Sequence, residues 1–543
     1  MLVSAAPTSF FYPPIKRFSA GKYCTKTNLQ FAANHPKINA FSSKNEQTHS
    51  LFTSCCHPPA SQLKAAAAAL DPQDGHAGIG ILEFFQGKNI FVTGATGLLG
   101  KVVVEKLLRS TSVGKIYLLI NAKDKEAAFD RLNCEILNSE LLACLKEKYG
   151  KSFGAFVKAK VIAVVGDICE PKLGMDYESI EAIRKDVNVI IHSAACTTFN
   201  ERYDLLVDTN VIAPQRVMRF AKTCNKLQLF AHVSTAYVTE RREGVILEKP
   251  LMMGGEDGKL DVADEISLLL KSSTNTIDAT NFFKKLGQHR AEMLGWSTTY
   301  QLSKAMGEMV VNEIRGDVPL LIIRPAIIES CHNQPLPGWI QGMRVFDPVV
   351  VSYGKGMIPA YFANPHVPLD IIPVDLVANI TIAVIAKHGN THVTAAQPTI
   401  YHVASSLQNP VTWFDAFEYL YEYFKEAPLI EGANISRVKF FDDFEEFSKC
   451  LRGEIMRHYG ANVDRKMVRQ CNAKATYVEQ LCKMYEFAGF LKPRYHTGNV
   501  QKLTEEMSKE EQFNFDVDVK NINWKKYFQE IHVPGLRKYV IDR

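Results

Sequence analysis

The sequence lacks any long apolar run without charges. A membrane-spanning helix needs about 18 or more consecutive apolar residues, and no such window occurs. The nearest candidate, VPLDIIPVDLVANITIAVIA, contains Asp370 and Asp375. We therefore expect no transmembrane segment, so that any association with a membrane would be peripheral.

Metal-type and disulfide-type cysteine spacings are also missing. The 12 cysteines form no CxxC pair and no Cys/His ligand pattern, so we predict free thiols in a reducing compartment and no metal site. The net charge is only +5, and no nucleic-acid motif or basic–aromatic stripe is present, so we expect no nucleic-acid partner. A length of 543 residues with 46% hydrophobic and 22% charged residues is typical of a globular protein with two domains and a tail.

Acidic residues are almost absent from residues 1–70. Glu46 is the one acid there, whereas Ser, Thr, Ala and Asn are abundant and no apolar block is long enough for a secretory signal. This composition predicts a plastid transit peptide and a chloroplast location, with a disordered basic tail as the alternative. The basic residues of the segment are Lys16, Arg17, Lys22, Lys26, Lys37, Lys44 and Lys64.

The most informative segment that is present is NIFVTGATGLLGKVVVEKLL. An apolar run ends at a glycine turn and continues as an amphipathic helix, the pattern of a dinucleotide-binding strand–turn–helix unit. The glycines permit a tight turn, close approach of a pyrophosphate and close packing of helix on sheet, while N–H groups at the helix start face the anion. The turn residues assigned to the cofactor are Thr93, Gly94, Ala95, Thr96, Gly97, Leu98, Leu99 and Gly100.

A second motif, YQLSK, supplies candidate chemistry. Tyr300 and Lys304 are spaced i, i+4, so on a helix both side chains leave the same face. A nearby ammonium lowers the pKa of a phenol, which makes Tyr300 a candidate general acid toward a carbonyl oxygen that receives hydride. Although YxxxK alone occurs by chance in many helices, its position downstream of the glycine turn favours catalysis.

Hydroxyl groups follow another predicted strand, Leu229–Val233. Ser234 and Thr235 stand at its carboxyl end, where ligands of open parallel sheets bind. Either hydroxyl could bind the reacting oxygen together with Tyr300; we prefer Thr235 and keep Ser234 as the alternate. Ordinary turn residues are the competing interpretation.

Alternating strand and helix patterns predict a doubly wound parallel Rossmann sheet. Apolar runs at 115–120, 161–165, 187–191, 229–233 and 320–323 are expected to be strands after the glycine turn's own strand. We divide the chain into the segment 1–70, a reductase domain at 77–410 with an insertion at 240–295, and a helical domain at 411–543. The insertion either covers the site or is a surface elaboration, and the aromatic stripes after residue 411 indicate core packing or a lipid-accepting groove.

The end of the second strand favours NADPH over NADH. No acid stands there to bind a ribose 2′-hydroxyl; Asn121 and Lys123 follow instead, and Lys123 could meet a 2′-phosphate. Asp167 is expected near the adenine. We also assign Ile168, Ser193, Ala194, Lys304 and Pro325 to cofactor binding.

Cys196 follows the fourth predicted strand and could approach the nicotinamide. We interpret it as a packed thiol and keep a thioester-attacking nucleophile as the alternative.

Beyond these patterns, nearly everything after residue 77 resembles the alcohol-forming fatty acyl reductases, relatives of the extended short-chain dehydrogenases. The resemblance rests on GIGILEFFQGKNIFVTGATGLLGK, HSAACTTFNERYD, HVSTAYV, GWSTTYQLSKAMGEMVV, IIRPAII, PLPGWIQG, DIIPVDLV and the C-terminal FNFDVDVKNINWKKY. With a plastid-type leader, the chain is similar to the plastidial, male-sterility-type branch. Three positions depart from the usual family pattern: Asn121, Cys196 and Ala326.

The resemblance implies a specific reaction. NADPH would reduce a long-chain acyl thioester, carried by coenzyme A or acyl-carrier protein, through an aldehyde to a primary alcohol for pollen wall or other extracellular lipid polymers. Tyr300 with Thr235 or Ser234 would stabilise the oxyanion, and Lys304 would hold the nicotinamide ribose. The alternatives are another extended dehydrogenase, such as an aromatic-CoA reductase or a sugar-nucleotide epimerase, and a non-catalytic NADP-binding protein.

An acyl-carrier protein is acidic, so its docking face on this chain should be basic. Two segments are candidates, and either could equally be a solvated helix face. Their cations are Lys284, Lys285 and Arg290 in one and Arg465, Lys466 and Arg469 in the other.

Overall fold

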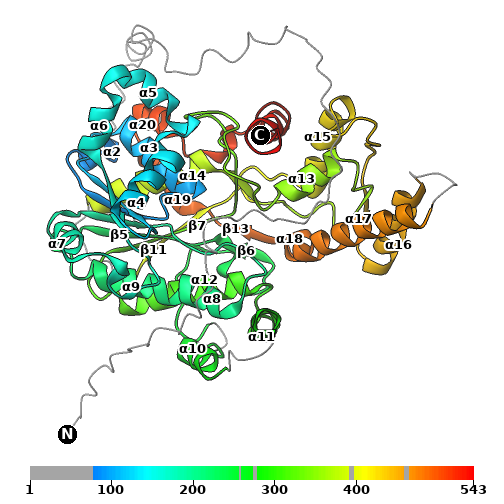
Figure 1. Cartoon of the computed structure of the whole chain (residues 1–543), viewed down its shortest axis with the longest axis horizontal. Coiled ribbons are helices and arrows are strands. Elements are labelled where there is room, and N and C mark those ends of the chain that lie inside the picture. Colours follow the sequence, from blue (N-terminus) through cyan, green and yellow to red (C-terminus); the bar gives the residue numbers. More distant parts are fainter. Residues whose placement is uncertain (1–77, 256–257, 273–277, 391–396, 458–463, 543) are drawn as a thin grey trace.

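The computed structural model describes residues 78–542, apart from 256–257, 273–277, 391–396 and 458–463 (Figure 1). The segment 1–70, for which we predict a transit peptide, lies outside the described residues.

A seven-stranded sheet with parallel pairings throughout lies at the centre of the fold, in the order β11-β7-β5-β4-β1-β2-β3. Val92 of β1 pairs with Leu118 of β2 on one side and Ile191 of β4 on the other. The chain order reverses between β1 and β4, and such a switch point is where doubly wound sheets bind ligands. The strands of this sheet are β1 (Ile90–Thr93), β2 (Ile116–Ile120), β3 (Val161–Val165), β4 (Val189–His192), β5 (Leu229–Val233), β7 (Leu320–Pro325) and β11 (Thr399–Val403).

The predicted strands are all present, and the fold class is confirmed. The predictions 161–165 and 229–233 coincide with β3 and β5, and the others differ from the structure by one to two residues at an end. Short apolar, β-branched runs that end in glycine or polar turns form strands because both faces of a parallel sheet are buried. The edge strand β11 was not predicted. Three further parallel pairs are β8 (Ile327–Glu329) with β10 (Ile371–Pro373), β9 (Ala360–Phe362) with β12 (Lys439–Phe441), and β6 (Gly244–Ile246) with β13 (Pro493–Tyr495).

Helices cover both faces of the sheet (Figure 1). Successive β1 residues point to opposite faces, so that Val92 packs in the core on the α3 side and Phe91 in the core on the α9 side. On the first face α3 also contacts α14, and on the second α9 contacts α12. The helices of residues 81–389 are α2 (Ile81–Phe85), α3 (Leu98–Ser110), α4 (Lys125–Arg131), α5 (Ala143–Tyr149), α6 (Phe153–Lys160), α7 (Tyr177–Asp186), α8 (Tyr203–Val207), α9 (Ala213–Ala221), α10 (Val262–Lys271), α11 (Ala279–Met293), α12 (Thr299–Ile314), α13 (Asp347–Gly354) and α14 (Val374–Gly389).

The C-terminal region is helical, as predicted, and α16 to α18 extend to one side of the molecule (Figure 1). Its aromatic stripe is core: Trp413, Phe417 and Phe424 of α15 are at most 3% exposed. One hydrophobic core runs from α3 through α14 and α16 to α22, across the boundary predicted at 410/411. The helices of this region are α15 (Trp413–Glu426), α16 (Phe444–Arg457), α17 (Arg465–Met484), α18 (Glu486–Phe490), α19 (Gly498–Glu506), α20 (Lys509–Asn514), α21 (Trp524–Lys526) and α22 (Val533–Leu536).

Candidate active site

The glycine turn between β1 and α3 lies against the end of β4. Gly94 has φ +76°, and a Cβ there would come within 2.6–2.8 Å of backbone atoms of Ser193 and Ala194. A Cβ on Gly100 would lie 2.2 Å from the Gly94 carbonyl oxygen, so this glycine lets α3 pack closely on the turn. The Thr93 hydroxyl is 2.7 Å from His192 Nδ1 and accepts a hydrogen bond from Ala194 N–H. The structure therefore brings together two predicted cofactor segments: the glycine turn and the Ser193–Ala194 pair.

The start of α3 fits a pyrophosphate. Its N-cap is Gly97, which has no side chain to cap the helix, so the first N–H groups, including those of Leu98 and Leu99, are not bonded by their own N-cap side chain. A Cβ on Gly97 would meet only the Gly94 oxygen, at 3.2 Å, so its absence leaves open space at the helix start. Uncapped N–H groups and the helix dipole favour an anion at this position.

The tips of β2 and β3 meet at the predicted adenosine end. Asn121 Nδ2 donates to Asp167 Oδ2 at 2.9 Å, and Asp167 Oδ1 accepts from Cys169 N–H at 2.8 Å. Lys123 instead extends into solvent, with its side chain 84% exposed and 3.6 Å from Asp124. The cation that contacts this tip is Arg131 of α4, which donates to the Asn121 carbonyl oxygen at 2.5 Å.

Arg131 could not be found from sequence because it stands ten residues beyond the strand tip on a helix without a motif. It is also ion-paired with Glu135 at 2.6 Å. Burial lowers the pKa of the neighbouring Lys101 to about 8; Glu135 raises it, and the charges of Arg344 and Arg131 lower it further. The cations Arg131 and Arg344 therefore lie close enough to Lys101, in the first turn of α3, to lower its pKa.

Tyr300 and Lys304 lie on α12. The N-cap residue of this helix, Thr298, accepts a hydrogen bond from Gln301 N–H. Lys304 is 2% exposed, and its Nζ donates to the carbonyl oxygen of Val233, the last residue of β5, at 2.9 Å. Burial lowers the pKa of Lys304 to about 8, although Glu308 one turn further raises it. This contact places the ammonium at the strand end that carries Ser234 and Thr235.

The Thr235 hydroxyl lies beside the Tyr300 side chain, near enough to bond its ionised form and so to lower its pKa. The Thr235 hydroxyl donates to the Pro325 carbonyl oxygen at 3.4 Å, which fixes it between β5 and β7. Ser234 is 6% exposed, and its Oγ has no hydrogen-bond partner among the described residues. Thr235, the hydroxyl that the sequence favoured, is thus the one in contact with Tyr300.

The pKa of Tyr300 is raised, whereas we expected it to be lowered. Burial raises it above its usual range and Cys196 raises it further, whereas the hydrogen bond with Thr235 lowers it. The i, i+4 spacing predicted a lower pKa through Lys304. That effect is not seen because the Lys304 ammonium is directed to the Val233 carbonyl oxygen. A raised pKa keeps the phenol protonated, which is the form that a general acid needs.

Asn210 holds the loop of Cys196 beside Tyr300. It lies in a π-helical turn (Asp208–Ile212), accepts a hydrogen bond from Cys196 N–H, and donates to the Cys196 carbonyl oxygen and to Ser303 Oγ, each at 2.9–3.0 Å. Turns of this kind are frequent at functional sites. Sequence reasoning missed Asn210 because no local pattern joins it to α12.

The PLPGWIQG segment also reaches the cofactor turn. Gln341 Nε2 donates to the Thr96 carbonyl oxygen at 3.2 Å, and Arg344 donates to the Gln341 carbonyl oxygen. Long-range packing thus brings a segment some 245 residues away onto the glycine turn.

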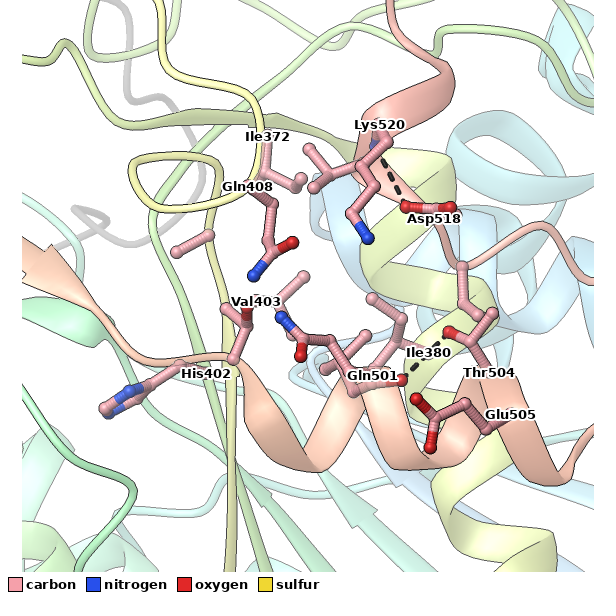
Figure 2. Close-up of a pocket in the computed structure, with 15 residues that line it drawn as sticks. Ile372, Ile380, His402, Val403, Gln408, Gln501, Thr504, Glu505, Asp518 and Lys520 are labelled. Atoms are coloured by element: carbon pink, nitrogen blue, oxygen red, sulfur yellow. Dashed lines mark hydrogen bonds between the residues drawn. The ribbon is translucent and has the colours of Figure 1, made fainter.

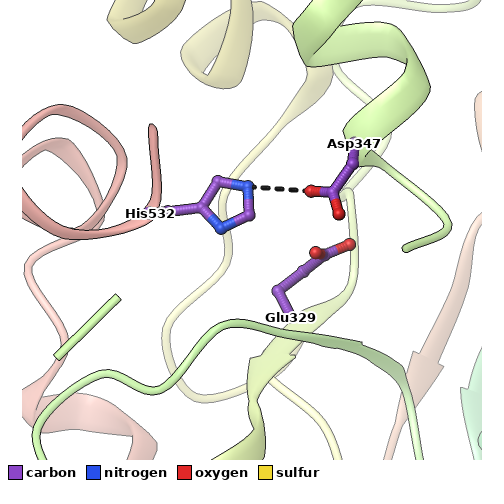
Figure 3. A group of neighbouring side chains, drawn as sticks. All are labelled: Glu329, Asp347 and His532. Carbon is purple, nitrogen blue, oxygen red and sulfur yellow. Dashed lines mark ion pairs between the residues drawn. The ribbon is translucent and has the colours of Figure 1, made fainter. Parts of the chain in front are cut away.

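Behind this loop, Glu329, Asp347 and His532 form a buried cluster (Figure 3). One atom of each lies within 4.8 Å of the others, a geometry that could hold a cation. The Arg344 backbone N–H donates a hydrogen bond to Asp347, however. Burial lowers the pKa of the Arg344 guanidinium, whereas the Asp347 and Glu329 carboxylates raise it. Burial and the Asp347 carboxylate raise the pKa of Glu329. We interpret the cluster as a charge network that joins β8, α13 and the C-terminal helix; the prediction of no metal site stays a prediction.

One cavity lies away from these residues. It holds about 140 Å³ between β11, α14 and α19, with Gln408, Gln501 and Lys520 directed into it (Figure 2). None of the proposed catalytic or cofactor residues lines it. A recess of about 30 Å³, which we call the Tyr237 recess, lies at the start of α12. Its lining residues include Tyr237, Arg241, Arg242, Gln301 and Phe487.

The parallel sheet, the glycine turn at its switch point and the Tyr300–Thr235 pair define a nicotinamide-dependent oxidoreductase of the extended short-chain dehydrogenase type. Residues 92–381 and 455–543 each match a family described as male sterility protein. Fatty acyl-CoA reductase 2, chloroplastic, of Arabidopsis thaliana is 42% identical over 493 residues, covering 86% of this chain and 80% of the relative. The alcohol-forming fatty acyl-CoA reductase of Simmondsia chinensis is 35% identical and covers 85% and 99%. The chain therefore belongs to the fatty acyl-CoA reductase family of oxidoreductases.

Solved structures support the fold. The terminal R domain of a myxalamid biosynthetic pathway has a TM-score of 0.54 at 17% identity, covering 88% of this chain and 98% of that domain. The family match confirms the predicted dinucleotide cofactor, and NADPH fits the strand tips, where Asn121 and Arg131 stand near Asp167. Among the described residues, no helix is long and apolar enough to cross a membrane.

Proposed function

We propose that this chain reduces a long-chain fatty acyl thioester to a primary alcohol by way of the aldehyde. The observation that carries the proposal is the placement of Tyr300 beside Thr235, whose hydroxyl is fixed at the carboxyl end of β5 in the sheet that also holds the glycine turn. Membership of the fatty acyl-CoA reductase family supports the substrate class.

Bound NADPH supplies hydride to the carbonyl carbon. As the carbonyl oxygen gains negative charge, the Tyr300 hydroxyl donates a proton to it, and the Thr235 hydroxyl turns from the Pro325 carbonyl oxygen to donate to the same oxygen. The resulting hemithioacetal then breaks its carbon–sulfur bond, releasing the carrier thiol and leaving the aldehyde. A second reduction with the same residues gives the alcohol.

Lys304 is a binding and positioning residue in this scheme. Its ammonium lies at the Val233 carbonyl oxygen, within the group of residues that faces the nicotinamide end of the site. We infer that it binds the nicotinamide ribose. Ser234, whose hydroxyl is buried and unpartnered among the described residues, is the second donor available to ribose or substrate.

The carrier and the biological setting extend the proposal. The acyl group rides on coenzyme A or on acyl-carrier protein, and the enzyme works in the plastid, as the name of the Arabidopsis relative and the composition of residues 1–70 support. Its alcohols would serve pollen wall or other extracellular lipid polymers. Membrane contact, if it forms, would be peripheral.

The reaction is tested by incubating the purified chain with palmitoyl-CoA and NADPH. We expect hexadecanol by mass spectrometry, two NADPH oxidised for each alcohol, and an aldehyde that a hydrazine reagent traps. Accumulation of aldehyde with one NADPH oxidised would contradict the alcohol product. Activity on aromatic thioesters or sugar nucleotides, with none on palmitoyl-CoA, would contradict the substrate class.

A further inference from the structure

The Tyr237 recess is lined by residues that neighbour the two proposed catalytic residues in the sequence. Gln301, which lines it, is the residue after Tyr300, and Tyr237 stands two residues after Thr235. Its other wall comes from the C-terminal region, through Phe487 and Tyr495. The recess is therefore built from the Rossmann sheet's loops and the C-terminal helices together.

A chain of aromatic rings connects the recess with Tyr300. The Tyr300 ring contacts Phe199 at 5.5 Å between centroids, Phe199 contacts Phe487 at 5.8 Å, and Phe487 contacts Tyr237 at 5.6 Å. All three contacts are edge-on, at 62–84° between ring planes. The residues that cover Tyr300 on this side are thus apolar and continuous with the recess.

Positive charge gathers at the outer rim. Arg241 and Arg242 both line the recess, and the Arg241 Nε donates to Ser297 Oγ at 3.3 Å, which orients its guanidinium there. Lys492 and Arg494 are exposed beside it on the segment that pairs with β6. Glu240 and Asp370 also line the recess, and Glu243 stands in the same loop. The Asp370 carboxylate is bonded to Ser405 and Ser406, so four cations face the two acids of the loop at this rim.

We propose that the Tyr237 recess binds the phosphate of the phosphopantetheine arm that carries the acyl thioester. Arginine is suited to this task because its planar fork binds phosphate oxygens two at a time. At about 30 Å³ the recess has room for a small group of this kind and not for the acyl chain. The arm then follows the aromatic rings inward, which brings its thioester to Tyr300.

This proposal rests on the proposed function and names the part of the substrate that the recess recognises. Coenzyme A and acyl-carrier protein share the phosphopantetheine phosphate, so both carriers would use the same two arginines. The cations predicted from sequence on α11 are less suited, because Arg290 is ion-paired with Glu265.

The test compares two palmitoyl thioesters that differ only in the phosphate: palmitoyl-phosphopantetheine and palmitoyl-pantetheine. For the unaltered chain we expect a higher kcat/KM with the phosphate. In Arg241→Ala/Arg242→Ala that advantage should fall by about 10–100-fold, the usual effect of losing charged hydrogen bonds, while the kcat/KM for palmitoyl-pantetheine and the affinity for NADPH stay unchanged. The control Arg465→Ala/Arg469→Ala removes two exposed arginines from α17 and should leave both substrates unaffected.

Each other outcome has a clear meaning. Equal kcat/KM for the two thioesters with the unaltered chain would overturn the proposal, as would equal losses on both substrates in the double variant. With palmitoyl-CoA and palmitoyl-acyl-carrier protein, similar losses would support a shared phosphate site, and a loss confined to the carrier protein would overturn it in favour of a protein-docking surface. Failure to reduce any palmitoyl thioester would instead contradict the proposed function itself.

Discussion

At the scale of single residues, the site depends on how each polar group is held. Thr235 is fixed by the Pro325 carbonyl oxygen and lies beside Tyr300, and Lys304 is fixed by the Val233 carbonyl oxygen. Two strands and one helix therefore determine the geometry of two hydroxyls and one ammonium. Side chains held in this way are pre-organised for charge that develops on a substrate oxygen.

Replacing Tyr300 by Phe should reduce kcat by about 10²–10⁴-fold, the usual contribution of a general acid. The ring contact with Phe199 remains, so NADPH affinity and thermal stability should change little. Single-turnover reduction of palmitoyl-CoA measures the rate, and fluorescence titration measures the affinity. A rate within about threefold of the parent would remove Tyr300 from the mechanism, because general acid catalysis is larger than that.

The affinity for NADPH should depend on the charge of Lys304. Because burial lowers its pKa to about 8, the ammonium is present below that pH and is lost as pH rises through it. We therefore expect the NADPH dissociation constant to rise between pH 7 and pH 9, and Lys304→Met to bind weakly without this pH dependence. A dissociation constant that stays flat in the unaltered chain would contradict the ribose role.

The lowered pKa of Lys304 also affects stability. A rise in pH weakens NADPH binding but increases the contribution of Lys304 to the free energy of unfolding. An unfolded lysine keeps its proton up to its ordinary pKa of 10.5, whereas the folded Lys304 loses it near 8. The unfolded chain thus binds more protons over this interval, so the contribution of Lys304 to the free energy of unfolding rises with pH there.

At the scale of elements, the β1–α3 unit combines two demands on its glycines. Gly100 serves packing, because a Cβ there would overlap backbone atoms of the turn, whereas Gly97 serves ligand access, because its Cβ would meet only one atom at 3.2 Å. A packing glycine and a ligand glycine should respond differently to the same added methyl group.

Gly100→Ala should lower the free energy of unfolding by about 1–3 kcal/mol, as overpacked sites do, and should weaken NADPH binding with it. Gly97→Ala should weaken NADPH binding at least as much while costing little stability, since the methyl group would occupy the space left for pyrophosphate. Urea denaturation and NADPH titration of both variants separate the two effects. Equal stability losses would contradict this assignment.

At the scale of the whole molecule, the start of the described chain is hydrogen-bonded to α20 in the C-terminal region. The Glu511 carboxylate of α20 accepts hydrogen bonds from the N–H groups of Ile79, Gly80 and Ile81 at 2.8–3.0 Å, and from Ser508 N–H at 2.9 Å. β13 adds a parallel pair to β6 of the insertion, and the core crosses residue 410 without a break. The C-terminal region therefore folds onto the Rossmann sheet as part of one structure.

Glu511→Ala should lower the free energy of unfolding by about 2–4 kcal/mol, because four backbone donors lose a charged acceptor. Glu510→Ala is the matched control, since Glu510 is its exposed neighbour on the same helix. Chemical denaturation followed by tryptophan fluorescence compares the two. If both variants have the stability of the parent, the hydrogen bonds of Glu511 to residues 79–81 do not contribute to the free energy of unfolding.

Local chain chemistry by itself determined much of this protein. The glycine turn, the strand runs and the YxxxK spacing are short-range patterns, so the sheet, α3 and the shared face of Tyr300 and Lys304 could be predicted from them. Family motifs then identified the type of enzyme. Asn121 and Asp167 were expected at one end of the cofactor site, and they lie together because carboxyl ends of neighbouring parallel strands meet at one edge.

Only the tertiary structure decided the contacts between distant segments. Three contacts have no local signature, because each depends on how separate elements pack: Arg131 at the strand tip, Asn210 beside Cys196 and Gln341 on the glycine turn. The direction of the Tyr300 pKa was decided in the same way. A spacing along a helix says which side chains share a face, whereas burial and the nearest hydrogen-bond acceptor determine where a lysine's charge goes.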